Sequence, residues 1–147
     1  MLTPRAPFYA SLSEHPPLSP RPDLKSVTTS LTPLQGHVSA LCSVAFFHLF
    51  DESRQRQIAH KFASLISPLP GSIIYGAHRG SPVKGLTNRT AIGGQPSQRF
   101  CHSPDSWKEL WDGEVFEKGT VRVEAELFRV NRGTEKAHWM QWSVTRL

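Results

Sequence analysis

Several ionisable side chains stand where apolar segments of the sequence begin or end. His48 follows one apolar run, the adjacent His78 and Arg79 follow another, and His102 directly precedes a helix start signal. Imidazole titrates near neutral pH, so His48 is a candidate general base. His78, Arg79 and His102 are candidates for holding an acidic substrate. Packing is the alternative for His48 and His102, and solvent exposure is the alternative for the basic pair.

The two cysteines, Cys42 and Cys101, are too few for a disulfide framework, and no Cys/His cluster has the spacing of a zinc site. We therefore expect no metal. Cys42 lies in an expected buried strand and should be inert, whereas Cys101 lies in an expected loop and should be exposed. Neither has a visible activating partner, which argues against a cysteine nucleophile.

Length and composition describe one domain of ordinary size, because the chain has 147 residues with 38% hydrophobic and 20% charged side chains. No apolar run approaches the ~20 residues of a membrane span. The N-terminus lacks the apolar segment of a secretory signal, so we expect a cytoplasmic protein without a membrane partner. The net charge is +5, but the basic residues of the acid-free stretch 65–104 are sparse, which argues against nucleic-acid binding.

Proline is concentrated near the N-terminus, where seven of the twelve prolines lie within residues 1–33. Proline disfavours helices and inner strands. We therefore expect residues 1–30 to form an extended tail and residues 31–147 to form the folded part.

The middle of the chain has the pattern of a strand–helix–strand unit. Residues 38–44 are apolar and β-branched, which favours a buried strand, and residues 46–50 suit a turn or a short helix. Asp51 is a good N-cap for a helix over 51–66, which has an apolar stripe and ends before Pro68. Residues 72–77 form the next expected strand. Such a unit gives parallel strands and an α/β fold.

The C-terminal part predicts a helix and a hairpin. Residues 78–102 are polar with scattered glycines and indicate a long loop. Ser103 and the following proline mark the start of a helix over 104 to about 116. Residues 120–127 and 139–145 alternate between apolar and polar side chains, which predicts two antiparallel strands.

Three strings of the sequence resemble a fungal family of class I S-adenosylmethionine-dependent methyltransferases that is associated with secondary metabolism, including meroterpenoid pathways. The strings are SVAFFHLFDESRQRQIAHKFASLISPLPGSIIYGAHRG, FCHSPDSWKELWDGEVFEKGTVRVEAEL and MQWSVTRL. The resemblance covers roughly residues 30–147. It implies the C-terminal half of a Rossmann-like sheet, namely strands four to seven of the family's seven, ending in an antiparallel hairpin.

The same resemblance implies S-adenosylmethionine as cofactor and a small molecule as substrate. Phe46 and Phe47 follow the first strand and are candidates for lining the cofactor or substrate pocket, with core packing as the alternative. The family's glycine-rich cofactor loop is missing, since Gly93 and Gly94 have neither a strand before them nor a helix pattern after them. We therefore expect a truncated product that does not bind the cofactor or turn over by itself.

A half-sheet would leave the strand at 38–44 as an open edge with unpaired backbone groups. This edge favours association with a second copy or with another protein. The alternative function is thus a non-catalytic half-domain that acts in interaction or dimerisation.

Overall fold

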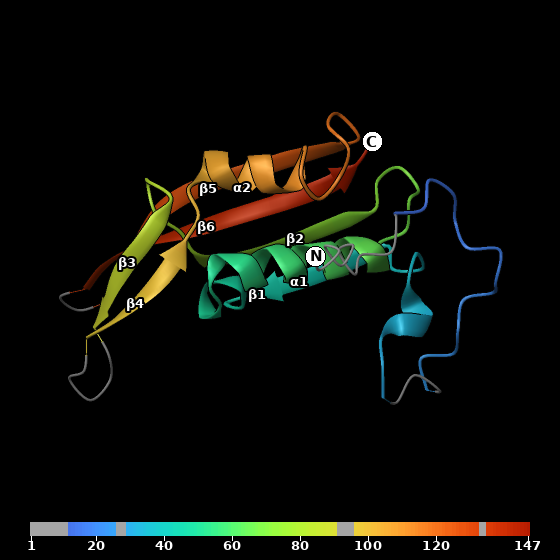
Figure 1. Cartoon of the computed structure of the whole chain (residues 1–147), viewed down its shortest axis with the longest axis horizontal. Coiled ribbons are helices and arrows are strands. Elements are labelled where there is room, and N and C mark those ends of the chain that lie inside the picture. The colour runs from blue at the N-terminus through green and yellow to red at the C-terminus, as the bar shows by residue number, and fades with distance from the viewer. Residues whose placement is uncertain (1–11, 26–28, 91–95, 133–134) are drawn as a thin grey trace, which may run out of the picture.

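The computed structural model describes residues 12–25, 29–90, 96–132 and 135–147. Two short 3-10 helices accompany two α-helices and six strands in this part of the chain (Figure 1). The elements follow in the order η1 (Thr32–Leu34), β1 (Ala40–Val44), η2 (Phe47–Leu49), α1 (Glu52–Leu65), β2 (Ile73–Arg79), β3 (Gly85–Thr90), β4 (Pro96–Cys101), α2 (Pro104–Trp111), β5 (Val121–Arg132) and β6 (Glu135–Arg146).

The main sheet has four strands in the order β1-β2-β6-β5. β1 and β2 are parallel, with Cys42 opposite Tyr75, and β6 runs antiparallel to both β2 and β5. The helix α1 connects the parallel pair, as a parallel connection requires. The expected α/β fold with a C-terminal antiparallel hairpin is confirmed. The hairpin strands are longer than the alternation indicated, and its turn at 133–134 lies outside the described residues.

The helix α1 begins and ends close to the predicted residues. The side chain of Asp51 accepts a hydrogen bond from the backbone N–H of Arg54 at 2.8 Å, which satisfies a donor of the first turn. The C-cap is Ile66, two residues before Pro68. The short helix expected within 46–50 is also present, as η2.

The helix α2 begins at the predicted cap but ends about five residues earlier than expected. Ser103 and Ser106 form a reciprocal capping box at its start. The C-cap is Asp112, and Gly113 follows with φ 129°, a conformation that side chains disfavour. The apolar residue Val115 continued the helical pattern in the sequence, but it is buried from a turn instead.

The prediction of a loop over residues 78–102 is wrong. β2 extends to Arg79, and β3 pairs with β4 from Gly85 opposite Cys101 onward. This ribbon carries few apolar residues in alternation, so its sequence lacks the usual strand pattern. An isolated two-stranded ribbon is marginally stable. Contacts with α1 hold it, since the Gln55 side chain donates to the carbonyl of Phe100 at 3.1 Å.

Both α-helices cover the same face of the main sheet, where the core lies. Aromatic side chains dominate this core. The Phe47 ring meets the Trp107 ring edge-on at 4.9 Å between centroids, and the Trp107 ring lies 5.0 Å from that of Trp142. Ile74 and Met140 complete the sheet side of the cluster and are almost fully buried. One contiguous core therefore joins the helices, the parallel pair and the hairpin.

No helix among the described residues covers the opposite face of the sheet. There Cys42 is exposed, the side chain of Val44 is 62% exposed, and that of Tyr75 is 44% exposed. The expected exposure of the cysteines is thus reversed, because Cys101, at the end of β4, is buried. Sequence alternation does not reveal which face of a strand is covered.

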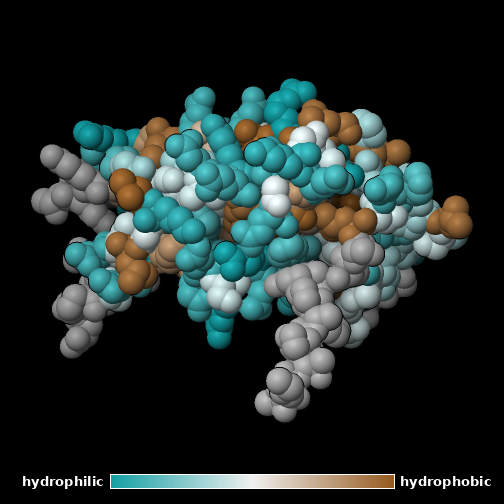
Figure 2. All heavy atoms as spheres, turned by 45° about the horizontal axis from the view of Figure 1, so that its top comes forward, coloured by the Kyte–Doolittle hydropathy of each residue, from teal (hydrophilic) through white to brown (hydrophobic). Residues whose placement is uncertain are grey.

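The described part of the expected tail, residues 12–25, has no helix or strand. It nevertheless lies against the folded part, because Leu12 packs on the core and Pro17 lies against Gly36. Across the face that Figure 2 shows, hydrophilic side chains cover most of the middle and hydrophobic ones show between them. Within the described ranges, no helix is long and apolar enough to cross a membrane.

Candidate functional site

The carboxyl ends of the parallel strands β1 and β2 bring several of the predicted site residues together. Ala45 turns the chain sharply after β1, with φ 55°, and its N–H donates to the carbonyl of Ala77 at 2.8 Å. This turn places His48 beside the end of β2. The backbone N–H of Arg79 then donates to Nδ1 of His48 at 3.3 Å. Ligands commonly bind at such strand ends in parallel sheets.

The side chain of His48 is half-buried at this edge. Its ring lies 6.4 Å from that of His78 and 6.0 Å from that of Trp139. Because Nδ1 accepts the Arg79 N–H, the neutral ring carries its proton on Nε2. In this arrangement Nε2 is a hydrogen-bond donor. The general-base role of His48 stays a prediction.

His78 lies in the core rather than at the surface. Its side chain is 1% exposed, and Nδ1 accepts a hydrogen bond from Trp142 Nε1 at 2.9 Å. Burial, followed by the nearby His48 and His102, lowers the pKa of His78 to about 3. The imidazole is therefore neutral at pH 7. Burial therefore excludes the solvent-exposed alternative for His78. The substrate-binding role of His78 and Arg79 stays a prediction.

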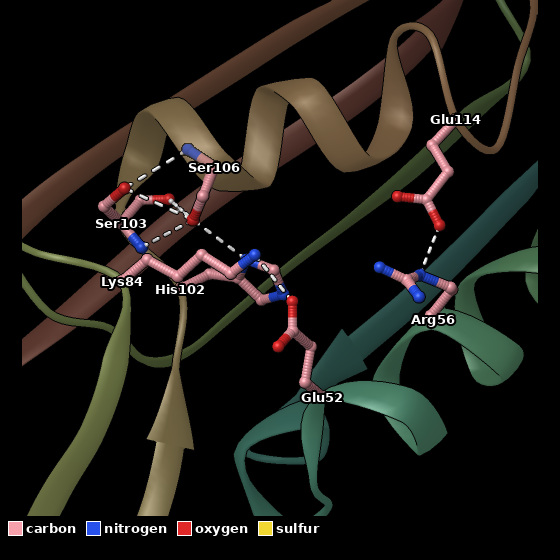
Figure 3. Close-up of polar contacts among 7 residues, drawn as sticks. All are labelled: Glu52, Arg56, Lys84, His102, Ser103, Ser106 and Glu114. Atoms are coloured by element: carbon pink, nitrogen blue, oxygen red, sulfur yellow. Dashed lines mark hydrogen bonds and ion pairs between the residues drawn. The ribbon is translucent and has the colours of Figure 1, made fainter.

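His102 is also buried, at the start of α2 (Figure 3). Its Nδ1 lies 2.9 Å from the hydroxyl of Ser106, which belongs to the capping box of that helix. Burial, followed by the charge of Lys84, lowers the pKa of His102 to about 4. Packing at the helix start, the alternative left open above, is what the structure shows. The substrate-binding role predicted for His102 stays untested.

A polar layer between α1 and α2 was not visible in the sequence. Lys84 Nζ lies 2.6 Å from Glu52 Oε1, and Arg56 forms an ion pair with Glu114 (Figure 3). The hydrogen bond from Lys84 holds the pKa of Glu52 below its usual value. These four side chains border a hollow of about 70 Å³, which is too small for a cofactor. Their residues are far apart in the sequence, so only the fold pairs them.

Phe46 and Phe47 occupy different environments. Phe47 is completely buried and touches the Trp107 and His78 rings, so it packs as a core residue. Phe46 is partly exposed and stacks parallel to Phe62 at 6.2 Å between ring centroids. Both rings thus pack against neighbouring aromatic side chains. The structure does not test the cofactor-binding role of either phenylalanine, which stays a prediction.

Comparison with known proteins shows which proteins this chain is similar to in sequence. Over 61% of its length, the chain is similar in sequence to a fungal O-methyltransferase. The relative is the O-methyltransferase phiE of Fungal sp. (strain ATCC 74256), which is 34% identical over 90 residues. This match confirms the resemblance to fungal methyltransferases. It spans 29% of the relative's length, so the chain corresponds to under a third of that protein.

No protein-family model matches the chain. A solved structure, that of the DhpI–SAH complex, has a TM-score of 0.44 and 12% sequence identity. The alignment covers 74% of this chain and 47% of DhpI.

Proposed function

We propose that this chain supplies the C-terminal half of an S-adenosylmethionine-dependent methyltransferase domain that acts on a small molecule of fungal secondary metabolism. The observation that carries the proposal is the 34% identity to an O-methyltransferase over 90 residues. The four-stranded order β1-β2-β6-β5, with its parallel pair and antiparallel hairpin, supports it.

Within such a domain, His48 and Arg79 contact the substrate. Both lie at the carboxyl ends of the parallel strands, and their backbone–side-chain hydrogen bond sets the His48 ring in one orientation. When bound, the cofactor supplies the methyl group, so the protein's contribution is mainly alignment of the reactants. An imidazole donor and a guanidinium suit the oxygen atoms of an acidic or hydroxylated substrate.

The cofactor is held largely by polypeptide other than this chain. The sequence contains no Gly-x-Gly-x-Gly run, and the Phe47 ring is buried in the core and not open to a ligand. Isothermal titration calorimetry of the folded chain with S-adenosylmethionine should therefore show no saturable heat. Binding with micromolar affinity would contradict this part of the proposal.

A chimera tests the methyltransferase assignment itself. The part of phiE that is similar to this chain is replaced by residues 40–146 of this chain, and methyl transfer to the substrate of phiE is measured. Retained transfer supports the proposal, and an Arg79→Gln chimera should then lose most of it. A matched Arg122→Gln chimera, which changes an exposed arginine on β5, should keep it. A folded chimera that binds S-adenosylmethionine but transfers no methyl group overturns the proposal.

A second candidate function is self-association through the open edge of β1. The edge strand pairs on one side only, and Val44 at its end is 62% exposed on the sheet face that no described helix covers. A second copy presents the same edge, so two β1 strands can pair around a two-fold axis. Sedimentation should then show a dimer that Val44→Lys dissociates and Leu86→Lys, at an exposed site on β3, leaves intact. A monomer at all concentrations removes this candidate.

A further inference from the structure

The guanidinium of Arg146 has an unusual environment at the end of β6. It lies over the Phe116 ring, with Cζ 5.0 Å from the ring centroid. Its Nε is buried and has no hydrogen-bond partner, and no described carboxylate forms an ion pair with it. A buried N–H of a cation that lacks an acceptor is costly. The cation–π contact offsets only part of that cost.

A hollow of about 240 Å³ opens beside this guanidinium. Its walls are mainly apolar and include no acidic side chain. They are formed by residues of the N-terminal segment, of α1 and of the turn after α2, among them Leu12, Pro17, Ser64, Ile66 and Phe116. One cation in an otherwise apolar hollow suits a ligand with a single anionic group.

The N-terminal segment closes one side of this hollow. Gly36 has φ 73°, and a Cβ built there would lie 2.8 Å from Cγ of Pro17. The segment therefore approaches the folded part as closely as a glycine allows. Arg146 is hydrogen-bonded through its N–H to Ser72, just before β2 begins. The hollow thus lies at the opposite end of the parallel strands from His48 and Arg79.

A second hollow of about 490 Å³ adjoins the first and shares Leu12, Gln35 and Ser64 with it. Its other walls include Phe62 and Leu65. His60 also lines it, but burial lowers the pKa of this histidine, which keeps the ring neutral at pH 7. The exposed Lys61 lines the second hollow as well, so a variant at that residue has to test whether the anion binds there. The walls at Phe62 and Leu65 offer room for an apolar chain.

We propose that the two hollows together bind an amphipathic monocarboxylate, with the carboxylate on Arg146 and the apolar chain directed along Phe62. Guanidinium and carboxylate form paired, charge-assisted hydrogen bonds, and Arg146 supplies the one cation in the described walls of the first hollow. The site is separate from the strand ends assigned to methyl transfer. The proposal stands whether or not the chain takes part in that reaction.

Octanoate, below its micellar concentration, is the probe. In an NMR titration of the ¹⁵N-labelled chain, we expect saturable shifts at the amides of Gly36, Ser64 and Arg146. Octan-1-ol has the same chain without the charge and should bind about tenfold more weakly, because a hydrogen bond to a charged group contributes about 1.5–3 kcal/mol. Shorter acids should lose about fourfold in affinity for each buried methylene removed.

Three variants locate the ligand. Arg146→Gln should weaken octanoate binding about tenfold or more. Lys61→Gln, the matched change at the exposed cation beside the second hollow, should leave the affinity unchanged. Ser64→Leu fills the shared wall with a good helix former and should abolish binding while the fold persists.

Three results overturn the proposal. The first is the absence of saturable shifts in the wild-type chain. The second is equal affinity for octanoate and octan-1-ol, since the guanidinium would then play no part. The third is a loss of binding in Lys61→Gln with none in Arg146→Gln, which would place the carboxylate elsewhere.

Discussion

The indole N–H of Trp142 donates a hydrogen bond to Nδ1 of His78 at 2.9 Å, inside the core. The two side chains are 3% and 1% exposed. This bond links the antiparallel strand β6 to the parallel strand β2, and it makes the imidazole an acceptor at Nδ1. His78 is thereby held as a neutral core residue, whatever reaction takes place at the nearby strand ends.

Removing this donor should destabilise the fold. Trp142→Phe leaves the buried Nδ1 of His78 without a partner, which costs on the order of 1–3 kcal/mol, and it also leaves a cavity. Trp139→Phe, at a half-buried tryptophan of the same strand, is the matched control and should cost clearly less. Urea unfolding followed by circular dichroism measures both free energies of unfolding. An equal decrease in the free energy of unfolding of both variants would show that the hydrogen bond to His78 does not stabilise the fold.

The chain should lose stability in mild acid. His78 and His102 have native pKa values of about 3 and about 4, below the 6.5 of an unperturbed imidazole. Between pH 6.5 and these values, only the unfolded chain binds the protons. The free energy of unfolding is therefore highest above pH 6.5 and falls as the pH decreases, by up to about 1.4 kcal/mol per pH unit for each histidine.

His78→Gln isolates the larger of these two contributions. Between pH 6 and 4, this variant should reduce the slope of unfolding free energy against pH by about 1.4 kcal/mol per pH unit, the contribution of one proton. His15→Gln, at an exposed histidine, is the control and should leave the slope unchanged. The slope is read independently of the variant's absolute stability. An unaltered slope in His78→Gln would mean that this imidazole is not buried in its neutral form.

Gly76 should not tolerate a side chain. A Cβ at this position of β2 would lie 1.8 Å from the backbone carbonyl oxygen of Ser43 on β1, so the two strands would have to separate. Gly76→Ala should therefore lower the free energy of unfolding by more than the 1–3 kcal/mol typical of overpacking. Ser43→Ala, which removes a buried hydroxyl without a partner, should be close to neutral. A Gly76→Ala protein of wild-type stability would contradict this strand spacing.

The capping box at Ser103 should stabilise α2 measurably. The Ser103 hydroxyl oxygen accepts from the backbone N–H of Ser106 at 3.2 Å, and the Ser106 hydroxyl oxygen accepts from the backbone N–H of Ser103 at 3.0 Å. Ser103→Ala should cost about 1 kcal/mol. Ser53→Ala, at an exposed serine in the first turn of α1 that is not its N-cap, should cost clearly less. Thermal unfolding of the two variants compares these effects.

Local signals account for the parts of the fold that were predicted well. Asp51 and Ser103 predicted the helix starts, because an N-cap side chain accepts a hydrogen bond from the backbone N–H three residues later. The alternation in 120–127 and 139–145 predicted the hairpin, because a strand with one covered face must alternate. The helix α2 ended early at Gly113 because backbone conformation, rather than apolar spacing, decides where a helix stops.

Of the candidate site, the sequence alone predicted that His48 and Arg79 lie at the ends of two parallel strands, and the structure showed the hydrogen bond between them. His48 and Arg79 follow successive parallel strands, whose carboxyl ends must lie at one edge of the sheet.

Only the tertiary structure decided which of these groups keep their charge and their access to solvent. His78 and His102 are buried by aromatic and helical neighbours that are distant in the sequence, and burial disfavours the charged imidazole. Tertiary contacts also decide the ribbon β3–β4, which depends on contacts with α1. They likewise decide the surroundings of Arg146, which come from both ends of the chain. Residue type and spacing determine local conformation, but burial and electrostatic environment arise from contacts between segments that no local pattern encodes.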